Sequence, residues 1–290
     1  MKTGLPAHFP SAAKVMINEK KRLDTLLVEK GLVETREKGR RLIMAGLVEI
    51  KGIASPPKPG IRISQDTEIL VHEPPEKYVS RGGIKLAHAL DYFHIQPRGY
   101  ICLDLGASTG GFTDCLLQRG AQSVYAVDVG YGQLDYRLRQ DKRVKLLERV
   151  NARRLSTREV PEPVDLVVID VSFISVRLVL KPVADLLQPK GSVVALIKPQ
   201  FEAGRDKVPK GGVVKDRKVH EQVLERVLGE FVRDGWSVLG LEPSPIAGMS
   251  GNREYFAHLC RPSSGPGEIF SGIHIPGLVS GAFEQSPEGL

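Results

Sequence analysis

Apolar residues along the chain follow two different patterns, one on each side of a proline-containing linker. In the first part they recur at helical spacing from Leu23 to Val33, and Gly31 is placed to end that helix. Thr35 can cap a second helix, which Gly46 ends. Short runs that predict strands follow at residues 47–52, 61–64 and 68–71. This order of helix, helix and short strands predicts a small α+β domain.

In the second part, apolar strand candidates alternate with helical stretches. The strand candidates are Ile101–Leu105, Ser123–Val127, Leu166–Ile169, Ser192–Ile197, Ser237–Leu241 and Tyr255–Cys260. Residues 217–233 form the clearest helix, with Val223, Leu224, Val227 and Leu228 on one face. The alternation predicts an α/β fold with a doubly wound sheet.

These patterns divide the chain into five segments. We expect a flexible arm at residues 1–19, a small domain at 20–73, a linker at 74–77, a large domain at 78–260 and a disordered tail at 261–290, which is rich in Gly, Pro and Ser.

Composition narrows the class of protein. Of the 290 residues, 41% are hydrophobic and 26% charged, as in globular proteins. We see no run long enough to span a membrane and no signal peptide at the start. Because the three cysteines form no C-x-x-C pair, we expect no disulfide framework, no metal site and a cytoplasmic protein. The net charge of +7 favours a polyanionic partner such as nucleic acid, or an anionic membrane surface.

A glycine-rich stretch, Cys102–Thr113, leaves a predicted strand and enters a predicted helix. Glycines let the backbone approach a ligand closely, and Asp128 ends the next strand, where its carboxylate can accept the hydroxyls of a ribose. The spacing departs from that of dinucleotide-binding loops. It resembles motif I of class I methyltransferases, in which the acid, here Asp104, faces the methionine end of the cofactor. The cofactor-binding residues predicted in this way are Asp104, Gly106, Ser108, Gly110, Gly111, Phe112, Asp128, Asn151 and Asp170.

Four further charged residues stand beside predicted strand ends or helix starts. Lys85 is placed just before the first helix of the large domain, Asp170 and Lys198 follow strands, and Glu254 precedes the last strand. In open parallel sheets, ligands bind beyond the carboxyl ends of the strands, so these side chains can meet beside the glycine loop. A ribose hydroxyl needs such help, because it is a poor nucleophile until it is deprotonated. We expect a neighbouring lysine to lower the pKa of the lysine that accepts the proton.

These motifs resemble a known family. Lys85, Asp170, Lys198 and Glu254 are similar to the Lys-Asp-Lys-Glu tetrad of FtsJ-like ribose 2′-O-methyltransferases, and the stretches around them resemble the TlyA family over residues 20–260. The resemblance implies S-adenosylmethionine as cofactor and cytidine ribose in ribosomal RNA or ribosomal subunits as substrate. It implies that Lys198 activates the hydroxyl and that Asp170 orients Lys198. Lys85 and Glu254 are implied to position the substrate and to tune Lys198.

Residues 21–52 are similar to the S4-type RNA-binding domain. The resemblance implies that basic side chains here meet phosphates of folded RNA, which sets position and affinity rather than sequence choice. These residues are Arg22, Arg36, Arg40, Arg41 and Lys51.

Some assignments stay open. Asn151 follows the apolar and basic residues 144–150, which we interpret as the third strand, and is either an adenine contact or a turn residue. Gln200 and Phe201 are candidates to line the pocket, and Phe201 could equally belong to the core. Rival interpretations are a pseudouridine synthase, which has no need of the glycine loop, a non-catalytic RNA-binding protein, and a membrane-active haemolysin, a label this family sometimes carries. No obligate protein partner can be inferred.

Overall fold

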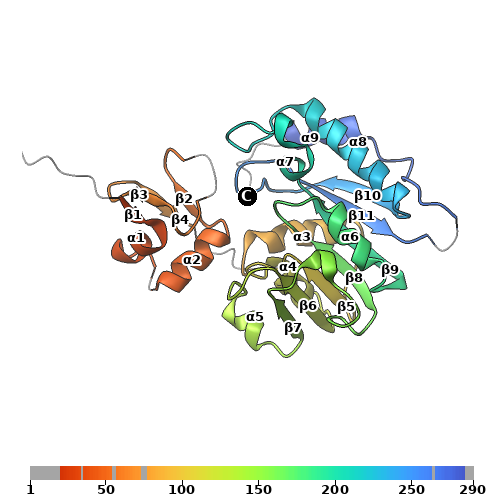
Figure 1. Cartoon of the computed structure of the whole chain (residues 1–290), viewed down its shortest axis with the longest axis horizontal. Helices are drawn as coiled ribbons and strands as arrows, with labels where there is room; N and C mark the ends of the chain where they lie inside the picture. Colours follow the sequence, from red (N-terminus) through yellow and green to blue (C-terminus); the bar gives the residue numbers. More distant parts are fainter. Residues whose placement is uncertain (1–19, 34, 54–56, 73–76, 263–264, 285–290) are drawn as a thin grey trace, which may run out of the picture.

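The computed structural model of the chain describes residues 20–33, 35–53, 57–72, 77–262 and 265–284. They form a small domain that ends before residue 73 and a large domain that follows it (Figure 1). The arm predicted at residues 1–19 and most of the predicted linker lie outside the described residues.

The small domain packs two helices against two antiparallel pairs of strands, β1 with β3 and β2 with β4. Its elements are β1 (Lys20–Arg22), α1 (Leu23–Glu29), α2 (Arg36–Met44), β2 (Val48–Ile50), β3 (Arg62–Ser64) and β4 (Ile69–Val71). Gly31 follows α1 with a φ of +68°, and the Thr35 hydroxyl accepts a hydrogen bond from the Lys38 amide at 3.1 Å. The predicted end of the first helix and cap of the second are therefore confirmed.

The large domain is built on a seven-stranded sheet in the order β10-β11-β9-β8-β5-β6-β7. Its strands are β5 (Ile101–Leu105), β6 (Ser123–Asp128), β7 (Val144–Glu148), β8 (Val164–Ile169), β9 (Leu187–Ile197), β10 (Ser237–Pro243) and β11 (Tyr255–Cys260). All neighbouring pairs from β9 to β7 are parallel, whereas β11 runs antiparallel to both of its neighbours. The predicted α/β fold with a mostly parallel sheet is confirmed.

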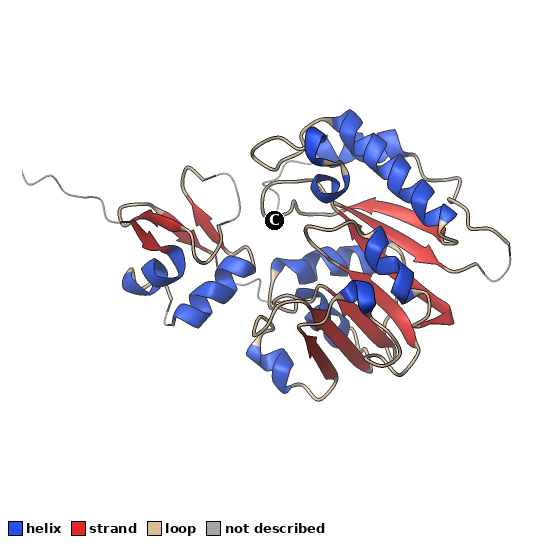
Figure 2. Cartoon of the chain, in the orientation of Figure 1, coloured by secondary structure: helices blue, strands red, loops and turns tan. Residues whose placement is uncertain are grey.

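Helices cover both faces of this sheet (Figure 2). They are α3 (Arg81–Tyr92), α4 (Gly111–Gln118), α5 (Tyr136–Gln140), α6 (Arg177–Val183), α7 (Pro199–Glu202), α8 (Arg217–Arg233) and α9 (Ile275–Glu284), with short 3₁₀ turns η1 (Ala152–Arg154) and η2 (Arg205–Lys207). Alternate strand residues point to opposite faces. Cys102 and Val124 therefore share one core with α3 and α4, while Leu103 and Tyr125 share the other with α6 and α8.

Strand β1 was not predicted, and β7 was absent from the apolar strand candidates, although residues 144–150 before Asn151 were interpreted as the third strand. β7 lies at the edge of the sheet and every one of its residues is partly exposed. An edge strand of this kind mixes charged and apolar residues, which is why the stretch lacks the apolar signal of the buried strands.

The prediction of a disordered tail is wrong for the described residues beyond 264. Helix α9 packs against α8, with Val279 and Ala282 buried and the Phe283 ring 5.0 Å from that of His220. Just before it, Phe270 donates its amide to the Val238 carbonyl at 2.9 Å and so covers edge strand β10. The glycine- and proline-rich stretch before Ile275 conceals the helical spacing of the apolar residues that follow.

The buried face of α9 can be tested through Val279, which is fully buried. We expect Val279→Asp to lower the free energy of unfolding by about 3 kcal/mol, because it buries a charge without a partner. The control is Glu284→Ala at the exposed end of the same helix. Equal denaturant midpoints for the two variants would show that α9 is not packed in solution.

Candidate active site

The glycine loop joins the end of β5 to the start of α4 and comes very close to the end of β8. Gly106 has a φ of +92°, and a Cβ at this position would lie 2.4 Å from the Asp170 carbonyl oxygen. Gly110 has a φ of +97°, and a Cβ there would lie 2.2 Å from a Leu138 methyl group. Side chains are excluded at both positions, so the loop exists only with glycine.

Asp104 stands at the end of β5 with no exposed surface. Its Oδ2 accepts a hydrogen bond from the Thr113 hydroxyl at 2.6 Å, but Oδ1 has no hydrogen-bond partner among the described residues. Burial, reinforced by the charge of Asp170, raises the pKa of Asp104 to about 7. A buried carboxylate oxygen without a partner is costly, and a cationic ligand group would satisfy it.

Asp128 is fixed at the end of β6 by backbone amides. Its Oδ2 accepts from the Ser108 amide at 2.8 Å and its Oδ1 from the Gly130 amide at 2.7 Å. Each carboxylate oxygen keeps a second acceptor position. Asp128 is therefore oriented beside the glycine loop and still able to accept hydroxyl groups.

The four charged residues of the predicted tetrad meet in two ion pairs. Lys85 Nζ lies 2.6 Å from Glu254 Oε2, and Lys198 Nζ lies 2.5 Å from Asp170 Oδ1. All four side chains are largely buried, and Gln200 Nε2 lies 3.4 Å from Glu254 Oε1.

The sheet brings these residues together. Asp170 follows β8 and Lys198 follows β9, where Pro199 begins α7. Antiparallel β11 places Tyr255 opposite Ile197, so Glu254 reaches the same edge from the other direction. The placement of Lys85 before the first helix was wrong, because it lies inside α3 and points from that helix to Glu254.

The electrostatics of Lys198 differ from the expectation. Burial opposes its charge, but the carboxylates of Asp170 and Glu254 outweigh this and hold the pKa of Lys198 above its usual value. The second lysine does not lower it, because Lys85 is itself paired with Glu254. In the free protein Lys198 is therefore a charged hydrogen-bond donor, and its Nζ also donates to the Ser172 hydroxyl at 3.1 Å.

The other predicted cofactor-binding residues have identifiable contacts within the protein. Asn151 accepts from the Arg153 amide at 3.1 Å and caps η1, as a turn residue does. Phe112 is buried and its ring centroid lies 6.2 Å from that of Phe256, so it packs in the core beside the glycine loop, and its contact with a cofactor stays a prediction. Gly111 has a similar role, since a Cβ there would lie 2.2 Å from Ser80 Oγ.

Sequence reasoning missed two residues at this edge. Ser172 binds Lys198, and Phe173, which is 81% exposed with a φ of +66°, lies 5.0 Å from the half-buried Phe201 between ring centroids. Both stand directly after Asp170, so the position of the motif at a strand end was the available signal.

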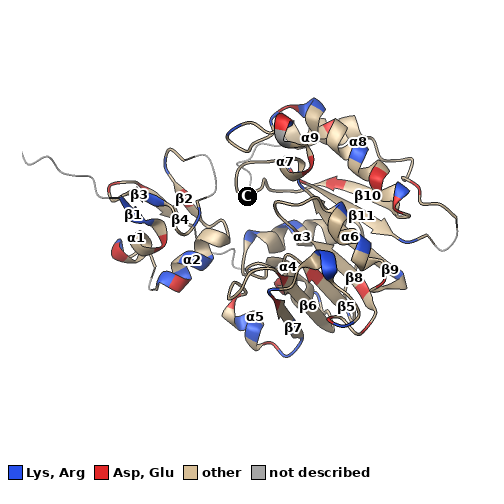
Figure 3. Cartoon of the chain, viewed as in Figure 1, with Lys and Arg blue, Asp and Glu red and all other residues tan. Residues whose placement is uncertain are grey.

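Four of the predicted RNA-binding residues are exposed and the fifth, Arg41, is partly exposed; Figure 3 shows basic positions along α2 of the small domain. Arg22 and Arg36 both pair with the buried Asp24, at 2.8 and 3.2 Å, whereas Lys51 pairs with Glu68 at 2.6 Å. Arg40 is exposed. Asp24 thus holds two of the five side chains together.

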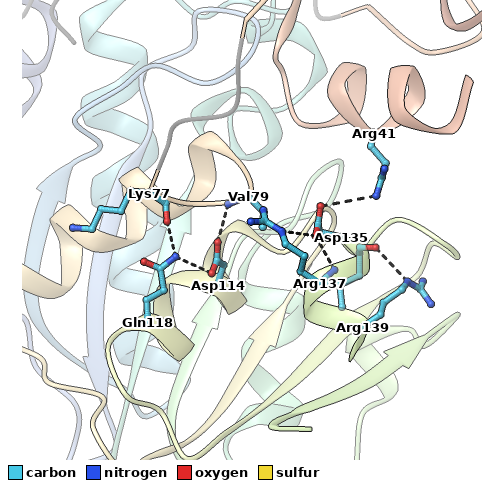
Figure 4. Close-up of polar contacts among 9 residues, drawn as sticks. Arg41, Lys77, Val79, Asp114, Gln118, Asp135, Arg137 and Arg139 are labelled. Carbon is cyan, nitrogen blue, oxygen red and sulfur yellow. Dashed lines mark hydrogen bonds and ion pairs between the residues drawn. The ribbon is translucent and has the colours of Figure 1, made fainter. Parts of the chain in front are cut away.

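The small domain lies against loops of the catalytic edge. Arg41 Nη1 is 3.9 Å from Asp135 Oδ2 (Figure 4). A Cβ at Gly46 would lie 2.7 Å from Met249 Cγ, in the loop that precedes Glu254. A cavity of about 770 Å³ lies elsewhere, at the end of α3 and the edge of the sheet, and contains none of the tetrad.

Comparison with known proteins agrees with this geometry. A family model described as FtsJ-like methyltransferase matches residues 78–261. The chain belongs to the FtsJ-like methyltransferase family. A second model, described as S4 domain, matches residues 21–52 of this FtsJ-like methyltransferase.

The relatives agree with the predicted resemblance to TlyA. This FtsJ-like methyltransferase is 49% identical over 254 residues to "Putative rRNA methyltransferase YqxC" of Bacillus subtilis, covering 86% of this chain and 89% of that one. It is 45% identical over 239 residues to "16S/23S rRNA (cytidine-2'-O)-methyltransferase TlyA" of Mycobacterium tuberculosis, covering 82% and 89%.

A solved structure titled "Putative hemolysin from Streptococcus thermophilus" shares 44% identity with this FtsJ-like methyltransferase. The TM-score is 0.72, and the match covers 92% of this chain and 97% of that one. Among the described residues of the present chain, no helix has the length and apolar character needed to cross a membrane.

The Asp24 cluster predicts a pH-dependent stability. The Arg22 guanidinium, helped by Arg36, lowers the pKa of Asp24 to about 2, against an ordinary value of 3.8. A depressed pKa stabilises the fold above about pH 4, and this contribution is lost as the pH falls towards 2. We expect Asp24→Asn to cost about 1–2 kcal/mol at pH 7, since solvent screens the half-exposed Arg22.

Denaturant unfolding at pH 7 and at pH 3 measures this effect, with Asp66→Asn, an exposed acid of the same domain, as the control. The difference between Asp24→Asn and the wild type should shrink at the lower pH. A difference that is independent of pH would refute the ion-pair explanation.

Proposed function

We propose that this protein transfers a methyl group from S-adenosylmethionine to a ribose 2′-hydroxyl of ribosomal RNA, at a cytidine. The observation that carries the proposal is the tetrad itself: two buried lysine–carboxylate pairs stand at the edge of the sheet where the glycine loop lies. The S4 domain supports an RNA substrate. The name of the Mycobacterium tuberculosis relative supports cytidine in ribosomal RNA.

The residues around the glycine loop suit this cofactor. When bound, S-adenosylmethionine supplies an electrophilic methyl group on a positively charged sulfur. Asp104 would accept the cofactor's amino group through its partnerless Oδ1, and Asp128 would accept ribose hydroxyls. Gly106 and Gly110 would let the backbone lie against the ligand.

Lys198 is the residue we assign to the substrate hydroxyl. Its ammonium can orient the ribose oxygen by donating a hydrogen bond, and its neutral amine can accept the hydroxyl proton. The raised pKa keeps the neutral form scarce in the free protein, but Lys198 loses its proton more readily when a second positive charge is bound beside it.

The bound cofactor would supply the methyl carbon that bonds to the ribose oxygen as its bond to sulfur breaks, and the chain's part is to place that oxygen and receive its proton. The hydroxyl proton stays on Lys198 Nζ until water removes it. Asp170 holds Nζ in place at 2.5 Å, and the Lys85–Glu254 pair adjoins it as a positioning element. Alignment of the reacting atoms by these groups supplies much of the expected rate.

Transfer of labelled methyl from S-adenosylmethionine to ribosomal subunits that lack the modification, followed by nucleoside mass spectrometry, tests the proposal. A 2′-O-methylcytidine product is expected. Binding of cofactor and RNA without incorporation would instead favour a non-catalytic RNA-binding protein.

We expect Lys198→Ala to lower the methyl-transfer rate by about 10² to 10⁴-fold, because it removes the group that receives the proton. Lys198→Arg should be similarly slow, since arginine can orient an oxygen but cannot accept a proton at neutral pH. Lys190→Ala is the matched control, an exposed lysine of the same strand far from the catalytic edge. Near-normal turnover of Lys198→Ala would exclude the assigned role.

Asp104→Asn should weaken cofactor binding about 10- to 100-fold, the cost of losing a charged hydrogen-bond partner. Because the pKa of Asp104 is about 7, its carboxylate gains a proton as the pH falls. Wild-type affinity should therefore be lower at pH 6 than at pH 8, and the affinity of Asp104→Asn should change less. Calorimetry at both pH values checks this, and identical pH dependence in the two proteins would contradict it.

A further inference from the structure

The loop after β6 carries large side chains that are mostly exposed to solvent. Tyr131 is 65% and Tyr136 66% exposed, in a segment that begins at the Asp128 carboxylate. Large exposed apolar side chains beside a candidate ligand site often mark an interaction surface.

Arg149 is held over the ring of Tyr131. Its guanidinium carbon lies 4.4 Å from the ring centroid. Among the described residues, Arg149 forms no ion pair with an acidic side chain. Arg149 has a φ of +60°, a conformation that is rare outside glycine, and two backbone hydrogen bonds maintain it: Arg149 N to Gly130 O and Val150 N to Asp128 O, both at 3.1 Å. Strained backbone of this kind is concentrated at binding sites.

The nearest acid in sequence does not neutralise this arginine. Glu148 Oε1 already accepts from the Gly132 amide at 2.7 Å and from Arg139. Arg149 is itself exposed, so it presents both a positive charge and a planar group to a ligand.

The end of the same loop approaches the small domain. Tyr136 follows Asp135, which lies 3.9 Å from Arg41 of α2, the helix that also carries Arg36 and Arg40 (Figure 4). Arg41 of α2 and Arg137 of α5 both pair with Asp135, at 3.9 and 3.3 Å (Figure 4).

We propose that Tyr131, Arg149 and Tyr136 form a base-stacking platform for RNA on the methyltransferase domain, which continues the basic surface of α2. This rests on the proposed function only in taking RNA as the partner. Unpaired bases stack on tyrosine rings and guanidinium planes regardless of sequence, whereas α2 meets phosphates. Backbone hydrogen bonds tie Arg149 and Val150 to the segment that begins at Asp128, so the platform lies beside the glycine loop.

Affinity for unmodified 16S and 23S ribosomal RNA transcripts, measured over a range of salt concentrations, tests the platform. Tyr131→Leu and Tyr136→Leu should each weaken binding about tenfold without changing the salt dependence, because a neutral stacking group is lost. Arg149→Ala should weaken binding and also reduce the salt slope by about one. Tyr92→Leu is the matched control, an exposed tyrosine that lines the separate cavity.

Cofactor affinity without RNA and the melting temperature are measured for every variant and should not change, since these side chains are exposed. Wild-type RNA affinity in Tyr131→Leu and Tyr136→Leu overturns the platform, as does a loss of cofactor affinity with RNA binding intact. The proposed function is tested by a different result. If the wild type binds the transcripts but transfers no methyl group, the proposed function is wrong, whereas the platform is still decided by the RNA affinities of the variants.

Discussion

The close approach of the Gly106 turn to the backbone of Asp170 is the contact on which the site depends. A single Cβ would overlap the Asp170 carbonyl oxygen at 2.4 Å, so β5 and β8 can end side by side only with glycine there. The chain places β6 and β7 on one side of β5 and β8 on the other. Open α/β sheets bind ligands at the point where the strand order reverses in this way. Asp104, Asp170 and Lys198 reach one edge because of it.

The buried charges at this edge of the sheet are arranged as two lysine–carboxylate ion pairs. Four largely buried ionic side chains would be very costly if isolated, but each lysine lies within 2.6 Å of a carboxylate. The pairs leave Asp104 Oδ1 without a partner and keep Lys198 charged. A fold selected only for stability gains little from such an arrangement, which is why perturbed buried charges in a ligand-binding crevice indicate chemistry.

The two domains meet close to this edge. Arg41 approaches Asp135, whose amide bonds the Thr109 carbonyl of the glycine loop at 3.1 Å, and Gly46 packs on Met249 in the loop before Glu254. The start of the large domain lies next to the same loop, because the Val79 amide donates to Asp114 of α4 at 2.8 Å (Figure 4). The small domain therefore lies next to the glycine loop and to the loop that precedes Glu254 of the tetrad.

The sequence by itself determined the fold class, most strands and helices, the glycine loop and the four tetrad residues, because periodicity, glycine and motif order are local properties. It was silent on what depends on neighbours distant in the chain. Edge strand β7 and helix α9 lacked an apolar signal of the expected kind, since one is half exposed and the other follows a glycine-rich stretch. Only the tertiary structure decided that Lys85 pairs with Glu254, 169 residues away, and therefore does not depress the pKa of Lys198. Distances between charges set their balance, and those distances are properties of the folded sheet.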